Sequence, residues 1–78
     1  MSKKRLRRRA ILSGIKQASG CVDCGYNEHP VALDFDHVRG EKEFTISDGL
    51  HRPWRDVLKE VNKCDVVCSN CHRVRTHK

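Results

Sequence analysis

Two pairs of cysteines constrain this chain more than any other feature of its sequence. Cys21 and Cys24 form one pair, Cys68 and Cys71 form the other, and 43 residues lie between the pairs. The two-residue spacer lets the backbone wrap an ion so that both sulfurs reach it at ~2.3 Å, and two pairs complete the tetrahedral four-thiolate set typical of zinc. The sequence therefore predicts a structural zinc site, closed because four sulfurs leave no position for a substrate.

A metal crosslink also suits the size of the chain. At 78 residues it is one domain at most, and such a domain buries only about 60 to 65% of the surface that its unfolded chain exposes. With one Trp, one Tyr and two Phe, a large aromatic core is not available, so the domain needs a further crosslink. The fifth cysteine, Cys64, is expected to pack as a small apolar residue in a strand.

Disulfides are the alternative use of cysteines in a small domain. The count of five is odd, and the apolar run after the basic start is about five residues, short of the ~7–15 of a signal peptide. No stretch is long enough to cross a membrane. We therefore expect a cytoplasmic protein with reduced cysteines, in which cysteine pairs favour metal binding.

The positive charge of the chain is concentrated at its start. The net charge is +6, and the Lys and Arg residues outside the first nine positions balance the ten Asp and Glu. In a chain without membrane features, a basic block favours contact with the phosphates of nucleic acid, and a solvated tail is the alternative. The six residues of this basic block are Lys3, Lys4, Arg5, Arg7, Arg8 and Arg9.

Hydrophobic periodicity predicts three helices. An apolar stripe among basic residues predicts a helix over 3–18 that Gly20 stops. A second stripe predicts a helix over 53–63, with Pro53 at its first position and Trp54 in the core. A last helix is expected to begin at Ser69 or Asn70, either of which can cap it, and to run toward His77.

Alternating apolar and polar residues predict short strands between these helices. Two segments show the pattern, at 31–36 and 43–47, and a third segment, at 64–67, is β-like. The first of these strands brings Asp36 and His37 to its end. We expect an α+β fold in which residues 1–20 form a basic arm or helix and residues 21–78 form the metal-stabilised domain.

A second group of chemically active residues stands beside the cysteines. If Cys71 binds zinc, His72 points elsewhere, because adjacent side chains on a helix diverge by about 100°. A strand, turn, strand and helix closed by the zinc would bring Asp36, His37 and His72 together. We therefore expect two metal sites, one closed and one open.

These residues resemble the HNH, or ββα-metal, nuclease family. The resemblance covers roughly residues 21–77 and is closest to the small stand-alone members common in phages and bacteria. It rests on CVDC at 21–24, LDFDHV at 33–38 and CDVVCSNCHRVRTH at 64–77. It implies a zinc-stapled ββα-metal domain, here with an N-terminal basic helix and an inserted helix.

The resemblance also implies a role for each residue. His37 would be the general base that takes a proton from the attacking water. Asp36 and His72 would hold one catalytic divalent cation, magnesium, manganese, nickel or zinc, against the scissile phosphate. The products expected of the family carry 5′ phosphate and 3′ hydroxyl ends.

Two positions depart from the family pattern. The middle Asn of the family braces the loop between the strands, but Lys63 occupies its place here, with Asn62 beside it and Asn70 inside the second cysteine pair. Asn62 is our candidate for the role. Thr76 stands where some members carry a third histidine ligand, which leaves His77 as the alternative.

The expected function is metal-dependent hydrolysis of phosphodiester bonds in DNA, with Arg39, Arg73 and Arg75 as further candidate DNA contacts or as ordinary solvated charges. A domain this small offers few base-reading elements, so we expect weak sequence specificity or a protein partner that supplies it. The alternatives are a noncatalytic zinc-ribbon-like module that binds nucleic acid and a structural subunit of a nucleoprotein assembly. The binding module leaves Asp36, His37 and His72 unexplained, and the structural subunit would make the basic arm a docking segment.

Overall fold

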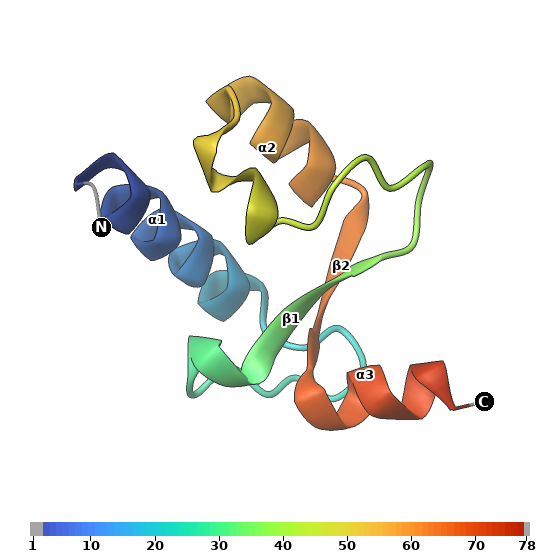
Figure 1. Ribbon diagram of the computed structural model, residues 1–78. Coiled ribbons are helices and arrows are strands. Elements are labelled where there is room, and N and C mark those ends of the chain that lie inside the picture. The colour runs from blue at the N-terminus through green and yellow to red at the C-terminus, as the bar shows by residue number, and fades with distance from the viewer. Residues whose placement is uncertain (1–2, 78) are drawn as a thin grey trace.

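A computed structural model describes residues 3–77 as three α-helices around a two-stranded antiparallel sheet, which confirms the α+β class (Figure 1). Two single-turn 3₁₀ segments, η1 and η2, precede β1 and α2. The elements in chain order are α1 (Lys3–Ser19), η1 (Pro30–Ala32), β1 (Leu33–His37), η2 (Asp48–His51), α2 (Trp54–Val61), β2 (Cys64–Cys68) and α3 (Ser69–Thr76).

Helix α1 forms where the apolar stripe predicts it. Gly20 follows the helix with a φ of 68°, a conformation that glycine adopts without strain. Its N–H donates to the carbonyl of Lys16 at 2.8 Å, which closes the last turn. Leu12 is buried in the core, so α1 is packed against the body of the protein.

The sheet pairs β1 with β2 in one register. Leu33 lies opposite Cys68, and His37 lies opposite Cys64. This register places the end of β1, with Asp36 and His37, beside the start of β2, and it places the start of β1 beside the second cysteine pair. Two hydrophobic clusters flank the sheet, and the half-buried Phe35 packs against both.

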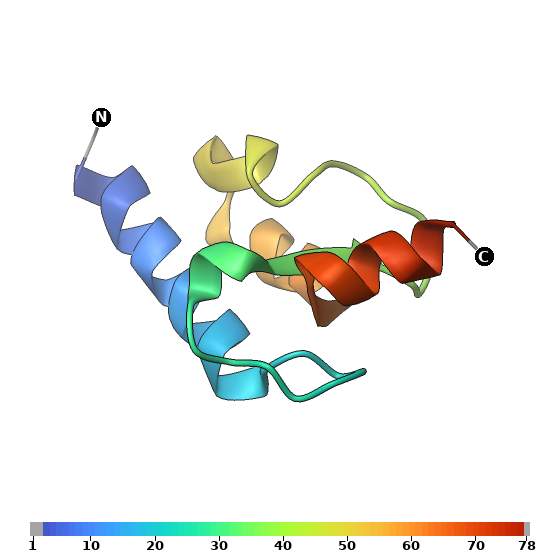
Figure 2. The same cartoon turned by 90° about the horizontal axis from the view of Figure 1, so that it is seen from below.

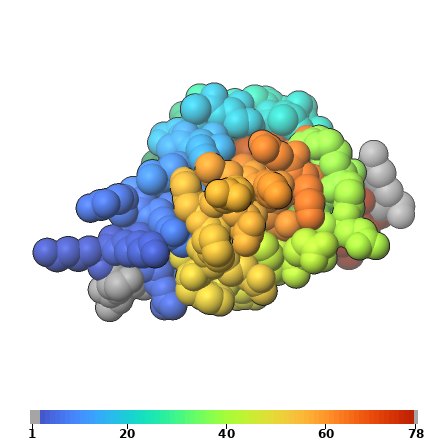
Figure 3. Space-filling model, turned by 90° about the horizontal axis from the view of Figure 1, so that it is seen from above, coloured from blue at the N-terminus to red at the C-terminus, as the bar shows by residue number. Residues whose placement is uncertain are grey.

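The three helices surround the sheet on different sides. In both ribbon views, α1 lies at one side of the sheet and α3 at the other (Figures 1 and 2). Helix α2 covers the face between α1 and the loop at 38–46, as the space-filling view shows (Figure 3). Trp54 packs against the first cluster, which confirms the prediction that it is a core residue.

The predicted strand at 43–47 is wrong, because turn and side-chain hydrogen bonds occupy this segment. The N–H of Glu43 donates to the Glu60 carboxylate at 2.9 Å. The N–H of Gly49 donates to the carbonyls of Thr45 and Ile46. These hydrogen bonds occupy backbone groups that would otherwise pair with a neighbouring strand. Ile46 is buried in the first cluster.

Several predicted boundaries also move. Strand β1 begins at Leu33 because Pro30–Ala32 form a turn in which Val31 is 91% exposed. Pro53 is the N-cap of α2, outside the helix, with a ψ of 135°. The N-cap of α3 is Cys68, whose sulfur accepts from the N–H of Cys71, so neither predicted cap is used.

Candidate functional site

The four paired cysteines form one cluster. Their sulfur atoms all lie within 4.8 Å of one another, and the sulfurs of Cys24 and Cys68 are 3.7 Å apart. Four sulfurs placed tetrahedrally at ~2.3 Å from an ion lie ~3.8 Å from each other. The cluster therefore has the dimensions of a four-thiolate metal site.

Backbone hydrogen bonds shape the first half of this cluster. The N–H of Gly25 donates to the carbonyl of Cys21 at 2.7 Å, and Cys21 donates to Tyr26. The N–H of Val22 donates to Val66 on β2, which ties the turn to the sheet. The turn at 21–24 is thereby held against the strand that carries Cys68.

The thiols of the cluster perturb one another's ionisation. Burial opposes ionisation of Cys21, but hydrogen bonds from the backbone at Cys68, Asp23 and Cys24 lower its pKa to about 6. The pKa of Cys71 rises to about 12, because its thiol shares hydrogen bonds with Cys68 and Cys21. Closely packed sulfurs cannot all carry a negative charge unless a cation lies among them.

Cys64 is separate from this cluster, as predicted. It is buried in the first hydrophobic cluster, and its sulfur donates to the carbonyl of Glu60 at 3.4 Å. Burial raises the pKa of the Cys64 thiol to about 11, and the nearby carboxylate of Glu60 adds to this effect. Cys64 is therefore a packed, neutral thiol at ordinary pH.

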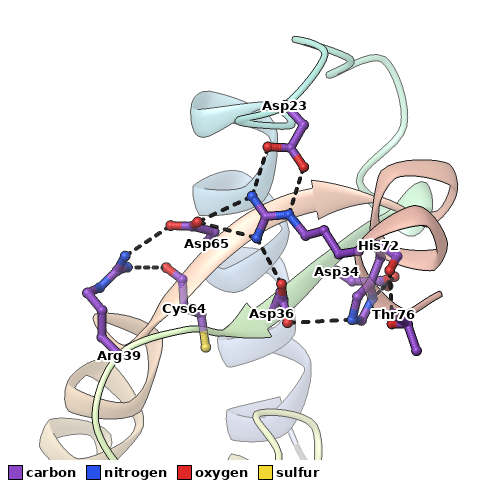
Figure 4. Close-up of polar contacts among 9 residues, drawn as sticks. Asp23, Asp34, Asp36, Arg39, Cys64, Asp65, His72 and Thr76 are labelled. Atoms are coloured by element: carbon purple, nitrogen blue, oxygen red, sulfur yellow. Dashed lines mark hydrogen bonds and ion pairs between the residues drawn. The ribbon is translucent and has the colours of Figure 1, made fainter. Parts of the chain in front are cut away.

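His72 points away from the cysteines and toward β1. Its Nδ1 lies 3.0 Å from Oδ2 of Asp34, and its Nε2 lies 3.7 Å from Oδ1 of Asp36 (Figure 4). Asp34 and Asp36 are two residues apart on a strand, so both face α3. The structure thus brings together Asp36 and His72, two of the three residues that the sequence predicts to meet, and adds Asp34, whereas His37 pairs with Glu60 instead.

The contact of His72 with Asp34 fixes the orientation of the ring. If Nδ1 donates to the Asp34 carboxylate, the lone pair of the neutral ring lies on Nε2, which faces Asp36. Metal-binding histidines commonly donate their second nitrogen to a carboxylate in this way. The arrangement is suited to a cation shared by Asp36 and His72.

Arg75 links this group to the cysteine turn. Its guanidinium lies 2.8 Å from Oδ2 of Asp36 and also contacts both carboxylate oxygens of Asp23, at 2.7 and 2.8 Å (Figure 4). A further contact reaches Asp65 at 3.4 Å. Asp23 and Asp36 raise the pKa of Arg75 above its ordinary value. Arg75 leaves Oδ1 of Asp36 to face His72 and holds the other oxygen in place.

His37 faces the opposite side of β1 and pairs with a buried carboxylate. Its Nε2 lies 3.0 Å from Oε2 of Glu60, which is 1% exposed. Burial opposes ionisation of Glu60, but hydrogen bonds from Lys63, the backbone of Glu43 and His37 hold its pKa at about 2. Glu60 is therefore ionised at neutral pH and fixes the imidazole of His37.

Lys63 braces the loop that follows β1. Its ammonium donates to the carbonyl of Glu41 at 2.6 Å and to Glu60 at 2.9 Å. Its own carbonyl accepts from the N–H groups of Val38 and Arg39. Lys63 thus holds this loop through both its ammonium and its backbone carbonyl. Asn62, our candidate, is the C-cap of α2, and its carbonyl accepts from Arg39.

The other candidate DNA contacts occupy different environments. Arg39 donates to Asp65 and to the carbonyl of Cys64. Arg73 is exposed on α3. His77 is the exposed C-cap of α3, and the hydroxyl of Thr76 donates to the carbonyl of His72. Contact of Arg39, Arg73 and Arg75 with DNA stays a prediction.

A cavity of about 690 Å³ opens beside β1 and joins the two histidines. His37 and His72 both line it, and so do Arg9 and Lys16 of α1. The ammonium of Lys16 lies 5.0 Å from the ring centroid of Phe35. Burial lowers the pKa of Lys16, although nearby Asp34 opposes the shift.

The basic block does not act as one unit. Arg8 is 8% exposed, and its Nη1 donates to the carbonyls of Leu50 and Arg52 at 2.7 and 2.6 Å. Its guanidinium also lies 5.2 Å from the ring centroid of Trp54. Arg8 therefore holds α1 against η2, while the other five residues of the block are exposed on α1.

Sequence reasoning missed three residues of this region. Asp34 shares a strand face with Asp36, and that spacing of two residues was a usable signal. The pairing of Glu60 with His37 had no local signal, because 23 residues separate them. Nothing in the sequence distinguished Lys16 from the other basic residues of its helix.

No protein-family model, curated protein or solved structure matches the chain. Within residues 3–77, no helix has the length and apolar composition needed to span a membrane. The functional argument therefore rests on the geometry of the described side chains.

Proposed function

We propose that the protein is a divalent-metal-dependent endonuclease of the HNH, or ββα-metal, type that hydrolyses phosphodiester bonds in DNA. The observation that carries the proposal is the placement of Asp36 and His72. Their facing atoms are 3.7 Å apart, and the second nitrogen of His72 is held by Asp34. Two ligand atoms bound to one cation at ~2.1 Å lie about 3.0–3.4 Å apart. A small side-chain adjustment brings the pair to that spacing.

The catalytic cation, magnesium, manganese, nickel or zinc, would be held by Asp36 and His72 with water in the remaining positions. When bound, it supplies stabilisation of negative charge on the phosphate and on the leaving 3′ oxygen. Arg75 holds the carboxylate of Asp36, and Asp34 holds the ring of His72. Both ligands are thereby oriented before a cation arrives, which reduces the cost of binding it.

His37 is the general base in this proposal. A neutral His37 that donates from Nε2 to ionised Glu60 carries its lone pair on Nδ1. Nδ1 then accepts the proton of the attacking water. His37 and His72 come from opposite faces of the sheet, but both line the cavity beside β1. A phosphate in that cavity would lie beside the base, His37, and beside His72, one of the two metal ligands.

The four-cysteine site is proposed to bind zinc. Four thiolates in a tetrahedron favour zinc, and a closed set has no open position for substrate. Because the cysteines lie at the two ends of the chain segment 21–71, the ion joins the turn after α1 to the start of α3. It thereby fixes the helix that carries His72. We place this activity in the cytoplasm of a bacterial cell or a phage-infected host, with a partner protein as a source of sequence specificity.

A noncatalytic module that binds nucleic acid is the second candidate, since the cysteine cluster and the basic α1 suit it equally well. Incubation of supercoiled plasmid with the zinc-loaded protein and each divalent cation separates the two. We expect cation-dependent conversion to open circles, and new ends with 5′ phosphate and 3′ hydroxyl groups. Plasmid that stays supercoiled with every cation, although the protein binds it, would favour the binding module.

A further inference from the structure

The face of α1 that borders the cavity is a stripe of three cations and a hydroxyl, exposed at Arg5 and Arg9 and half-buried at Ser13 and Lys16. Its residues are Arg5, Arg9, Ser13 and Lys16, spaced by four, four and three positions. At 100° per residue, these four positions lie within about 80° of the helix circumference. Lys3 and Arg7 lie on the opposite side of the helix, and Lys4 lies about 100° from Arg5. Within the basic block, helix geometry therefore separates Arg5 and Arg9 from Lys3, Lys4 and Arg7.

The stripe lines a continuous depression in the surface. A second cavity, of about 240 Å³, is bordered by Arg5, Arg9, Ser47 and Leu50. The last three of these residues also border the larger cavity. The two hollows therefore adjoin, and together they extend along α1 from Arg5 to Lys16.

Lys42, Thr45 and Ser47 also line the larger cavity. Two carboxylates border the depression as well, Asp34 in the larger cavity and Asp48, which accepts from the hydroxyl of Thr45, in the smaller one. The cations that line the depression, Arg5, Arg9, Lys16 and Lys42, outnumber these carboxylates. The larger cavity ends at His37 and His72. A ligand that follows the stripe is thus led to the proposed catalytic residues.

We propose that this depression, the α1 groove, binds the phosphate backbone of the strand that is cut. Arg5, Arg9 and Lys16 each contact a phosphate, while Ser13 and Ser47 donate hydrogen bonds. From Arg5 to Lys16 the helix rises about 16 Å, so the three cations are spread along the helix and can contact different phosphates of one strand. The inference rests on the proposed nuclease function for the position of the scissile phosphate, but binding in the groove does not require cleavage.

The groove also gives different roles to residues of one basic block. Arg8 is committed to the carbonyls of η2 and the loop after it. Lys3, Lys4 and Arg7 attract DNA only through their general field, because they do not border the groove. Lys16, which lies outside the block, lines the same cavity as His37 and His72.

Two matched triple variants test this division. One carries Arg5→Gln, Arg9→Gln and Lys16→Gln, and the control carries Lys3→Gln, Lys4→Gln and Arg7→Gln. Each removes three charges from the same helix and keeps long side chains of good helix propensity. Both are made in a His37→Ala background, and affinity for a 20-base-pair duplex is measured at several salt concentrations without added catalytic cation.

The groove variant is expected to reduce the magnitude of the slope of log K against log salt by about 2 to 3. Its affinity for the duplex should fall by a factor of the order of 10² at 100 mM salt. The control is expected to change the slope by less than about 1. Amide resonances of α1 and of residues 42–47 should also shift when DNA is added to the His37→Ala protein. Equal slope changes in the two triple variants, or shifts confined to other surfaces, would overturn the groove. Wild-type protein that binds through the groove but never nicks DNA would refute the nuclease proposal alone.

Discussion

Replacing Asp34 by alanine removes the carboxylate that orients His72. The bond between Nδ1 of His72 and Oδ2 of Asp34 is 3.0 Å long, and without it the ring can rotate and change its tautomer. Loss of such a partner typically weakens metal binding by about 10- to 100-fold. Asp34 is 42% and His72 36% exposed at the side chain, so water screens the contact. We therefore expect Asp34→Ala to weaken metal binding by the lower end of this range, about 10-fold, or ~1.4 kcal/mol of binding free energy.

The assay titrates manganese into zinc-loaded protein and follows both plasmid nicking and the electron paramagnetic resonance signal of free manganese. Asp34→Ala should raise the half-saturating manganese concentration about 10-fold in both measurements, with the rate at saturation changed by a few-fold at most. Asp34→Asn should fall between Asp34→Ala and the wild type, because its amide oxygen can still accept from His72. Asp56→Ala, an exposed change in the first turn of α2, is the matched control. An unchanged midpoint in Asp34→Ala would refute the orienting role.

Further predictions concern Arg8 and two of the cysteines, Cys71 and Cys64. Arg8→Ala should lower the free energy of unfolding by about 1.5–3 kcal/mol in urea denaturation, because it removes two hydrogen bonds from a charged group, whereas Arg7→Ala on the exposed side should change it little. Cys71→Ser should lose the tightly bound metal in native mass spectrometry and with it the fold, while Cys64→Ala should keep about one ion. Since the pKa of the Cys64 thiol is about 11, iodoacetamide at pH 8 should leave it unmodified in the folded protein, and the reaction should speed up as the pH rises toward 11. Alkylation of Cys64 at the rate of an unfolded control would contradict its burial.

Local patterns in the sequence predicted the elements whose burial follows their own periodicity. The stripe that includes Leu12 predicted α1, and the series from Trp54 to Val61 predicted α2. The alternation of Leu33 and Phe35 predicted a strand, although Val31 did not join it. In each case one face of the element packs against a hydrophobic cluster, so the period of the sequence and the burial agree.

The parts that could not be predicted depend on contacts between distant residues. Phe44 and Ile46 alternate like a strand, but their segment, 43–47, is not a strand because its backbone is bonded within turns and to Glu60. Arg8 resembles its basic neighbours in the sequence, and only the carbonyls of Leu50 and Arg52 distinguish it. Such pairings arise when the chain closes on itself, and no local period encodes them.

The candidate site was likewise predicted only where a local pattern determines it. The cysteine spacing predicted the four-cysteine cluster because four sulfurs in two short turns have few other arrangements. Neither the spacing nor the resemblance to HNH nucleases indicated that Glu60 would hold His37 or that Asp34 would hold His72. These partners are selected by the register of β1 against β2 and by the position of α2.

The central claim is that His37 activates water for phosphodiester hydrolysis, and one comparison of rates tests it most directly. Initial nicking rates are measured at saturating plasmid and saturating cation for wild type, His37→Ala and His29→Ala, the last of which removes an exposed imidazole. The account predicts that His37→Ala lowers the rate by the order of 10²–10⁴, with bound zinc and DNA affinity unchanged, and that His29→Ala nicks like the wild type. Equal rates for His37→Ala and the wild type would contradict it.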